Sequence, residues 1–106
     1  MASLKADPGR WTTLGKRTVC TDPSPEDEGR EAPDLILLAC SDPGRIDSRS
    51  VVRLAGPRTI VIGHPSCVSR FRSNLVAVLP GQQRRVLGIE IAVDEDGPGR
   101  LRYRIG

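Results

Sequence analysis

The sequence predicts a small α/β domain, in which a partly parallel sheet is flanked by helices and ends in an antiparallel hairpin. Two continuous apolar runs, residues 34–40 and 59–63, are typical of strands that are buried on both faces. The segment between them is long enough for the crossover that two adjacent parallel strands require. Near the end of the chain, residues 85–93 and 100–105 have the pattern of strands and flank an acidic turn, which predicts the hairpin.

The composition limits the class of protein. The chain has 106 residues, of which 38% are hydrophobic and 3% aromatic, so it has room for one core of modest size. A net charge of +3 with 27% charged residues does not favour a nucleic-acid-binding arm. No apolar run approaches the roughly 18 to 20 residues of a membrane span, and the start lacks the apolar centre of a signal peptide. We therefore expect a cytoplasmic protein that binds neither nucleic acid nor membrane.

Residues 1–33 have the composition of a flexible arm. They contain four of the nine prolines, a stretch of mixed charge and few large apolar side chains. Such a segment cannot bury enough apolar surface to order itself, although Trp11 can dock it on the body or on a second subunit. We therefore expect the folded domain at residues 34–106.

A short helix is predicted between the two buried strands. The apolar residues of segment 48–55 recur at helical spacing, and Asp47 or Ser48 can cap its start. Gly56 and then Pro57 follow directly, as they do after many helices. This helix supplies the crossover between the strands.

The second half of the domain is predicted to contain one more helix and the hairpin. Residues 68–79 carry an apolar stripe with spacings of three and four, which predicts a helix that Ser66 caps and Pro80-Gly81 ends. Residues 85–93 and 100–105 then form the hairpin. The expected order is strand, helix, strand, helix, strand, strand.

Side chains with metal-binding chemistry follow both buried strands. Cys40 ends the first strand, and His64 and Cys67 come directly after the second. Since ligand sites in open α/β sheets lie at the carboxyl ends of the strands, we expect the three side chains to converge. Two thiolates and one imidazole suit a tetrahedral zinc ion with one position left over. Asp42 and Arg45 lie in the loop after Cys40, where they can form an acid and base pair beside the metal.

Three segments resemble the β-class carbonic anhydrases. Residues 38–42 (Leu-Ala-Cys-Ser-Asp), followed by 45–47 (Arg-Ile-Asp), resemble the family's Cys-Ser-Asp-Ser-Arg-Val-Asp segment. Residues 63–67 (Gly-His-Pro-Ser-Cys) resemble its Gly-His-x-x-Cys segment. The tail, 87–103, is similar to the family's closing strands, with a Gly-containing strand, an acidic turn and Gly-x-Leu. The resemblance therefore covers residues 34–106.

The resemblance implies a zinc ion held by Cys40, His64 and Cys67, with Asp42 and Arg45 as the family's Asp-Arg pair. In the family, that Asp accepts a hydrogen bond from zinc-bound water or ligates the zinc itself. The implied activity is zinc-dependent hydration of carbon dioxide to bicarbonate, or hydrolysis of a close analogue such as carbonyl sulfide or carbon disulfide. Zinc makes this possible because it lowers the pKa of bound water to about 7. The implied assembly is a homodimer or a higher homo-oligomer.

Alternative interpretations stay open. Family members are about twice as long, and here Cys40 and His64 are only 24 residues apart. The main alternative is therefore a non-catalytic zinc-binding domain derived from a β-carbonic anhydrase, in which the metal stabilises a small core. A thiolate nucleophile at Cys40 with Arg45 as an anion cradle is less well supported, because the acidic residue between them would repel an anionic substrate. Cys20 has no partner at ligand spacing and is expected to be a free thiol.

Overall fold

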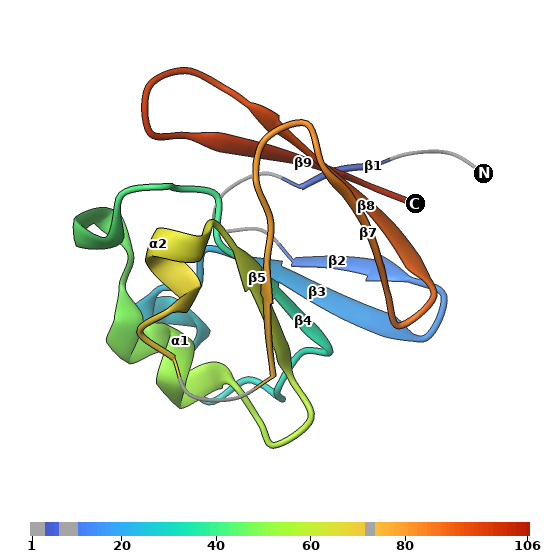
Figure 1. Ribbon diagram of the computed structural model, residues 1–106. Coiled ribbons are helices and arrows are strands. Elements are labelled where there is room, and N and C mark those ends of the chain that lie inside the picture. Colours follow the sequence, from blue (N-terminus) through green and yellow to red (C-terminus); the bar gives the residue numbers. More distant parts are fainter. Residues whose placement is uncertain (1–3, 7–10, 72–73) are drawn as a thin grey trace.

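The computed structural model describes residues 4–6, 11–71 and 74–106. These residues form two sheets packed face to face, and two short helices cover the outer face of one sheet (Figure 1). Neither helix has the length and apolar character that a membrane crossing requires. The chain therefore has three layers, of helices, a mixed sheet and an antiparallel sheet.

The five-stranded sheet is mixed, with strand order β2-β3-β4-β5-β6. Its strands are β2 (Trp11–Leu14), β3 (Arg17–Thr21), β4 (Leu35–Leu37), β5 (Ile60–Gly63) and β6 (Leu75–Ala77). Only β2 is antiparallel to its neighbour, and β3 to β6 run parallel. The predicted parallel pairing of the two apolar runs is confirmed by β4 and β5.

The crossover between β4 and β5 contains the predicted helix, α1 (Ser48–Leu54). The carboxylate of Asp47 caps it by accepting a hydrogen bond from the Ser50 backbone N–H at 3.1 Å. The predicted helix is thereby confirmed, with Asp47 rather than Ser48 as its cap. Val51 and Leu54 are buried on the face toward the sheet.

The four-stranded sheet is antiparallel, with strand order β1-β9-β8-β7. Its strands are β1 (Leu4–Ala6), β7 (Gln83–Val86), β8 (Ile89–Glu95) and β9 (Leu101–Ile105). The predicted hairpin is confirmed by β8 and β9. The predicted single strand at 85–93 is wrong, because Leu87 and Gly88 both adopt positive φ, of 52° and 79°. Two such residues form the tight turn that joins antiparallel strands, so this segment reverses and β7 pairs with β8.

The larger core lies between the two sheets. Tyr103, Ile62 and Ile91 are among its fully buried members. A smaller core lies between the five-stranded sheet and the helices and includes Ile36 and Val51. Helices therefore cover one face of the mixed sheet, and the antiparallel sheet covers the other. The predicted flanking by helices holds for one face only.

The outer face of the antiparallel sheet is charged. Along β8 and β9 the inward side chains are apolar, and the outward ones form ion pairs, of Arg104 with Asp94 at 3.0 Å and, across to β7, of Arg85 with Glu90 at 3.5 Å. Alternation of this kind is typical of a sheet with one face in water.

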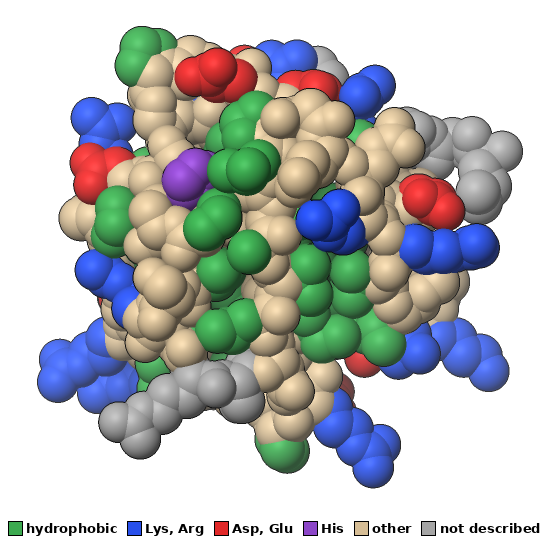
Figure 2. Space-filling view, in the orientation of Figure 1, with side chains coloured by type: hydrophobic (Ala, Val, Ile, Leu, Met, Phe, Trp, Pro, Cys, Tyr) green, Lys and Arg blue, Asp and Glu red, His purple; other side chains and the backbone are tan. Residues whose placement is uncertain are grey.

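Strand β6 lies at one edge of the mixed sheet. Apolar side chains gather along it on the surface in the centre of Figure 2. Leu75 and Val76 are half-buried, and Leu79, just beyond the strand, is 43% exposed. This edge leaves backbone groups free to pair with another strand.

The predicted flexible arm is wrong for residues 11–33. Strand β3 lies between β2 and β4, and its residues Val19 and Cys20 are completely buried, one toward each core. Strand β3 is short, contains two threonines, and precedes a charged segment. Its apolar content is therefore too low to indicate a core strand. Residues 1–3 and 7–10 of the predicted arm lie outside the described residues.

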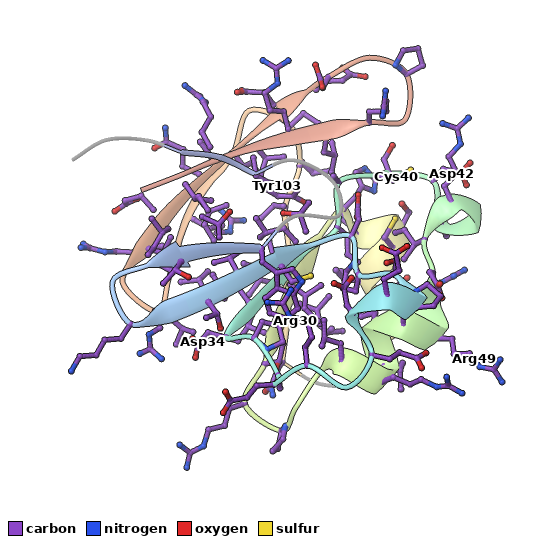
Figure 3. All side chains as sticks on the ribbon, turned by 180° about the vertical axis from the view of Figure 1, so that it is seen from behind. Arg30, Asp34, Cys40, Asp42, Arg49 and Tyr103 are labelled. Carbon is purple, nitrogen blue, oxygen red and sulfur yellow. The ribbon has the colours of Figure 1, made fainter. Side chains whose placement is uncertain are left out.

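The proline-rich segment after β3 is tied to the body through Asp27. The Trp11 indole N–H donates to Asp27 Oδ1 at 2.7 Å, and the Ser24 backbone N–H donates to Oδ2 at 2.8 Å. The guanidinium of Arg30, labelled in Figure 3, lies 4.0 Å from the centre of the Trp11 ring. One buried carboxylate therefore orders a segment whose composition suggests disorder.

Asp27→Asn is expected to lower the free energy of unfolding by about 1.5 to 3 kcal/mol at pH 7, because it weakens hydrogen bonds to a charged group. Although burial acts to raise the pKa of Asp27, the hydrogen bonds from Trp11 and Ser24 lower it overall, below its ordinary 3.8. The stabilisation is therefore complete above about pH 4 and is lost as the pH falls through the lowered pKa. Urea unfolding of the wild type, Asp27→Asn and the exposed control Glu31→Gln at pH 7 and near pH 2.5 tests this. An equal loss at both pH values would contradict it.

The predicted second helix at residues 68–79 is wrong. Helix α2 spans only Pro65–Val68 and is capped by His64 rather than Ser66, and Leu75–Ala77 form β6. Asn74 has a left-handed φ of 55°, and its carbonyl accepts from Val61 N at 2.8 Å, which places the chain beside β5. The apolar stripe fits strand and helix spacing alike, and pairing with β5 decides between them. Residues 72–73 of this predicted helix lie outside the described residues.

Candidate functional site

The predicted site lies where the chain leaves β4 and β5 at their carboxyl ends. After β4 the chain continues to Cys40, which forms an antiparallel bridge with Arg100 at the start of β9. Two backbone hydrogen bonds hold this crossing, from Leu101 N to Ala39 O at 2.8 Å and from Ser41 N to Gly99 O at 2.9 Å. Cys40 therefore lies where the two sheets meet, as Figure 3 shows beside Asp42.

Gly63 allows the loop after β5 to approach β4 closely. A Cβ atom at Gly63 would lie 3.0 Å from Leu38 Cβ and 3.3 Å from Val68 Cγ1. Only glycine fits here without displacing a neighbour. The loop that carries His64 and Cys67 is thereby placed directly beside the loop that carries Cys40.

The two cysteine-bearing loops are in direct contact. The thiol of Cys67 donates to the carbonyl of Cys40 at 3.1 Å, and the Ser66 hydroxyl donates to the carbonyl of Ser41 at 2.8 Å. Burial raises the pKa of the Cys67 thiol, with a smaller contribution from Cys40. Cys40 is half-buried, and its sulfur accepts from Asp42 N at 3.3 Å.

His64 caps helix α2 instead of facing both cysteines. Its Nδ1 lies 2.7 Å from Ser66 Oγ and 3.2 Å from Ser66 N. Because the Ser66 backbone N–H can only donate, Nδ1 is the acceptor nitrogen of the neutral ring. Nε2 then carries the ring proton and faces away from this cap.

The three predicted zinc ligands share one edge but do not form a ligand set. Within residues 4–6, 11–71 and 74–106, no three His, Cys, Asp or Glu side chains are grouped closely enough to hold a metal ion. Cys40 and Cys67 are brought together and His64 lies in the adjoining turn. Cys20 lies apart in β3 as a free buried thiol, and burial raises its pKa to about 12.

The predicted Asp42 and Arg45 pair is present at the surface. Asp42 Oδ1 accepts from Gly44 N at 3.0 Å and caps a short turn, Pro43–Arg45. Its other oxygen lies 3.7 Å from Arg45 Nε, and the two side chains are 54% and 66% exposed. An exposed pair at this distance contributes little to stability, so both side chains can move.

Sequence reasoning missed Asp22 and Arg100. They line a hollow of about 240 Å³ together with Ala39, Cys40 and Arg45. Asp22 was assigned to the arm, although an Asp-Pro pair after a strand is a turn signal. Arg100 was assigned to the hairpin, and only the packing of the two sheets brings it to Cys40.

A larger hollow, of about 390 Å³, lies on the helix side of the molecule. Its lining is mostly apolar, with Arg70 at the rim. It contains no cysteine, histidine or carboxylate in its described lining, so it offers no reactive group. The chemistry of the molecule is therefore concentrated at the carboxyl edge of the mixed sheet.

Comparisons with known proteins give no family for this chain. No protein-family model matches it, and no curated protein matches it. The resemblance to the β-carbonic anhydrases therefore rests on the short motifs at Cys40, His64 and the closing strands.

Proposed function

We propose that this edge binds one zinc ion through Cys40, His64 and Cys67, and that the zinc-loaded protein hydrates carbon dioxide. The observation that carries the proposal is the direct contact between the two loops, from the Cys67 thiol to the Cys40 carbonyl at 3.1 Å. The donor types, two thiols and one imidazole, suit zinc. The present positions of these groups do not suit zinc, because the Cys67 thiol and His64 Nδ1 make hydrogen bonds with other partners.

Zinc binding would therefore require small side-chain rotations in this loop cluster. The Cys67 thiol must leave the Cys40 carbonyl and lose its proton, which its raised pKa opposes. His64 can offer Nε2 only after its ring proton moves to Nδ1, where it would donate to Ser66 Oγ instead of accepting from Ser66 N. With three protein ligands, a bound zinc ion would supply an acidified water whose pKa is about 7.

Asp42 and Arg45 would control access to that position. Asp42 Oδ1 accepts from Gly44 N, and its other oxygen faces Arg45. Arg45 can draw the carboxylate away from the cysteines or leave it beside them. In this proposal Asp42 orients the water and Arg45 orients Asp42.

The zinc content of the purified protein tests the metal site. We expect about one zinc ion per chain in the wild type and less than about half in Cys40→Ser, since a site of three ligands is weakened strongly by loss of one. Cys20→Ser is the matched control, because this thiol is buried away from the edge, and it is expected to keep the full amount. Wild-type protein with no zinc, or Cys40→Ser with a full equivalent, would refute the site.

Stopped-flow hydration of carbon dioxide, measured on zinc-loaded protein, tests the activity. We expect a rate above buffer that rises between about pH 6.5 and 9, and a lower rate in Asp42→Ala. A full equivalent of zinc with no hydration at any pH would refute the activity and support the alternative, a non-catalytic zinc-binding domain.

A further inference from the structure

A polar cleft runs along the carboxyl ends of β3 and β4. The hollow of about 240 Å³ beside Cys40 shares Asp22 and Arg45 with a second hollow of about 130 Å³, so the two lie side by side. This is the place where open sheets with parallel strands bind small ligands.

Two arginines line the cleft from different parts of the chain. Arg45 comes from the turn after β4, and its side chain is 66% exposed and only weakly paired with Asp42. Arg100 directly precedes β9, and its bridge with Cys40 fixes the position of its backbone. Because a guanidinium donates in a planar fork, two of them together favour a small oxyanion over other ligands.

Asp22 gives the cleft a hydrogen-bond acceptor. Its carboxylate accepts from Ala39 N through Oδ1 at 2.9 Å, and its own backbone N–H donates to Leu37 O at 2.9 Å. These bonds hold Asp22 at a left-handed φ of 47°, which aspartate adopts more readily than most residues other than glycine. The oxygen Oδ2 is left to accept from a ligand. An anion without a proton would be repelled by this carboxylate, whereas one with a hydroxyl group can donate to it.

We propose that this cleft binds hydrogen phosphate, with Arg45 and Arg100 donating to its oxygens and Asp22 accepting from its hydroxyl group. Hydrogen phosphate keeps one proton at pH 8. Sulfate, of the same shape and charge, keeps none, and neither does the dianion of a phosphate monoester. The cleft therefore favours the free ion over a phosphorylated metabolite.

Calorimetric titration of the full-length chain at pH 8, at constant ionic strength and with a chelator present, tests the proposal. We expect inorganic phosphate to bind at least about tenfold more tightly than sulfate or methyl phosphate, because a site that accepts a hydroxyl proton rejects analogues that lack one. Equal affinities, or no binding of phosphate, would overturn the proposal. Since the chelator removes zinc, the result is independent of the proposed metal site.

Three variants test which side chains bind phosphate. Arg100→Gln is expected to weaken phosphate binding at least about tenfold, because a charge-assisted hydrogen bond is lost. Arg102→Gln, on the same strand but paired with Asp96 at 2.7 Å, is the matched control and should leave phosphate binding unchanged. Asp22→Asn should bring phosphate and sulfate to similar affinity, since an amide can donate to either. Unchanged binding in Arg100→Gln, or a preserved preference for phosphate in folded Asp22→Asn, would overturn the proposal.

Discussion

A chain that begins at residue 34 is expected to show no cooperative unfolding transition. This truncation removes β2 and β3, exposes one whole edge of β4, and takes Val19 and Cys20 out of the two cores. A domain of this size has a free energy of unfolding of about 5 to 15 kcal/mol. We expect the stabilisation lost with a strand that is buried on both faces to exceed this free energy. Circular dichroism during urea titration measures the transition.

Two substitutions in the full chain provide the control for this truncation. Val19→Ala is expected to lower the free energy of unfolding by about 2 to 3 kcal/mol, because it leaves a cavity between the sheets. Lys16→Ala, in the exposed turn between β2 and β3, should change it by less than about 0.5 kcal/mol. A truncated chain with a wild-type transition would mean that residues 1–33 are an arm after all.

Replacement of Tyr103 is expected to have the largest effect of any single substitution. Its ring is completely buried between the sheets, and its hydroxyl donates to the carbonyl of Leu38 at 2.6 Å. Burial raises the pKa of this hydroxyl far above its usual range, so it stays protonated and can donate at every ordinary pH. Tyr103→Ala should lower the free energy of unfolding by about 3 to 5 kcal/mol. Tyr103→Phe should lower it by about 1 to 3 kcal/mol, because the Leu38 carbonyl loses a partner.

Tyr103→Phe also tests whether the Tyr103 hydroxyl supports the candidate site. Leu38 lies two residues before Cys40, so the Tyr103 hydroxyl supports the segment from which Cys40 projects. We expect Cys40 in Tyr103→Phe to react faster with a thiol reagent than in the wild type, while buried Cys20 reacts at its wild-type rate. Equal unfolding free energies of Tyr103→Phe and the wild type would show that this hydrogen bond adds nothing.

The parts of the fold that the sequence predicts are those with local boundary signals. Helix α1 has Asp47 at its start and Gly56 after its end, and the segment between the two apolar runs is long enough to let them pair in parallel. Strand β3 lacked such signals. Its place in the sheet depends on the anchoring of the next segment through Asp27 and Trp11, which are 16 residues apart. Contacts between distant residues of this kind are invisible to local patterns.

The sequence predicts where the candidate site lies, but not how its side chains are oriented. The rule that ligand sites lie at the carboxyl ends of strands places Cys40 and Cys67 together, and their loops do touch. The direction of each side chain depends on nearby hydrogen bonds, such as the contact of His64 with Ser66. Asp22 and Arg100 come from segments 78 residues apart and meet because the two sheets pack against each other.

The pairing of β1 with β9 constrains how the chain folds. Leu4 lies opposite Ile105, so the antiparallel sheet joins segments from the two ends of the described chain. Closing a loop of this length costs conformational entropy before any contact repays it, which slows folding. During synthesis, the β1 edge cannot form until β9 has left the ribosome, and until then the apolar faces of β8 and of the mixed sheet are incompletely covered. Leu4 and Ile105 are also close enough that a circular permutant, joined near them by a short linker and opened at the exposed turn after β8, should retain the nine strands that the structure describes.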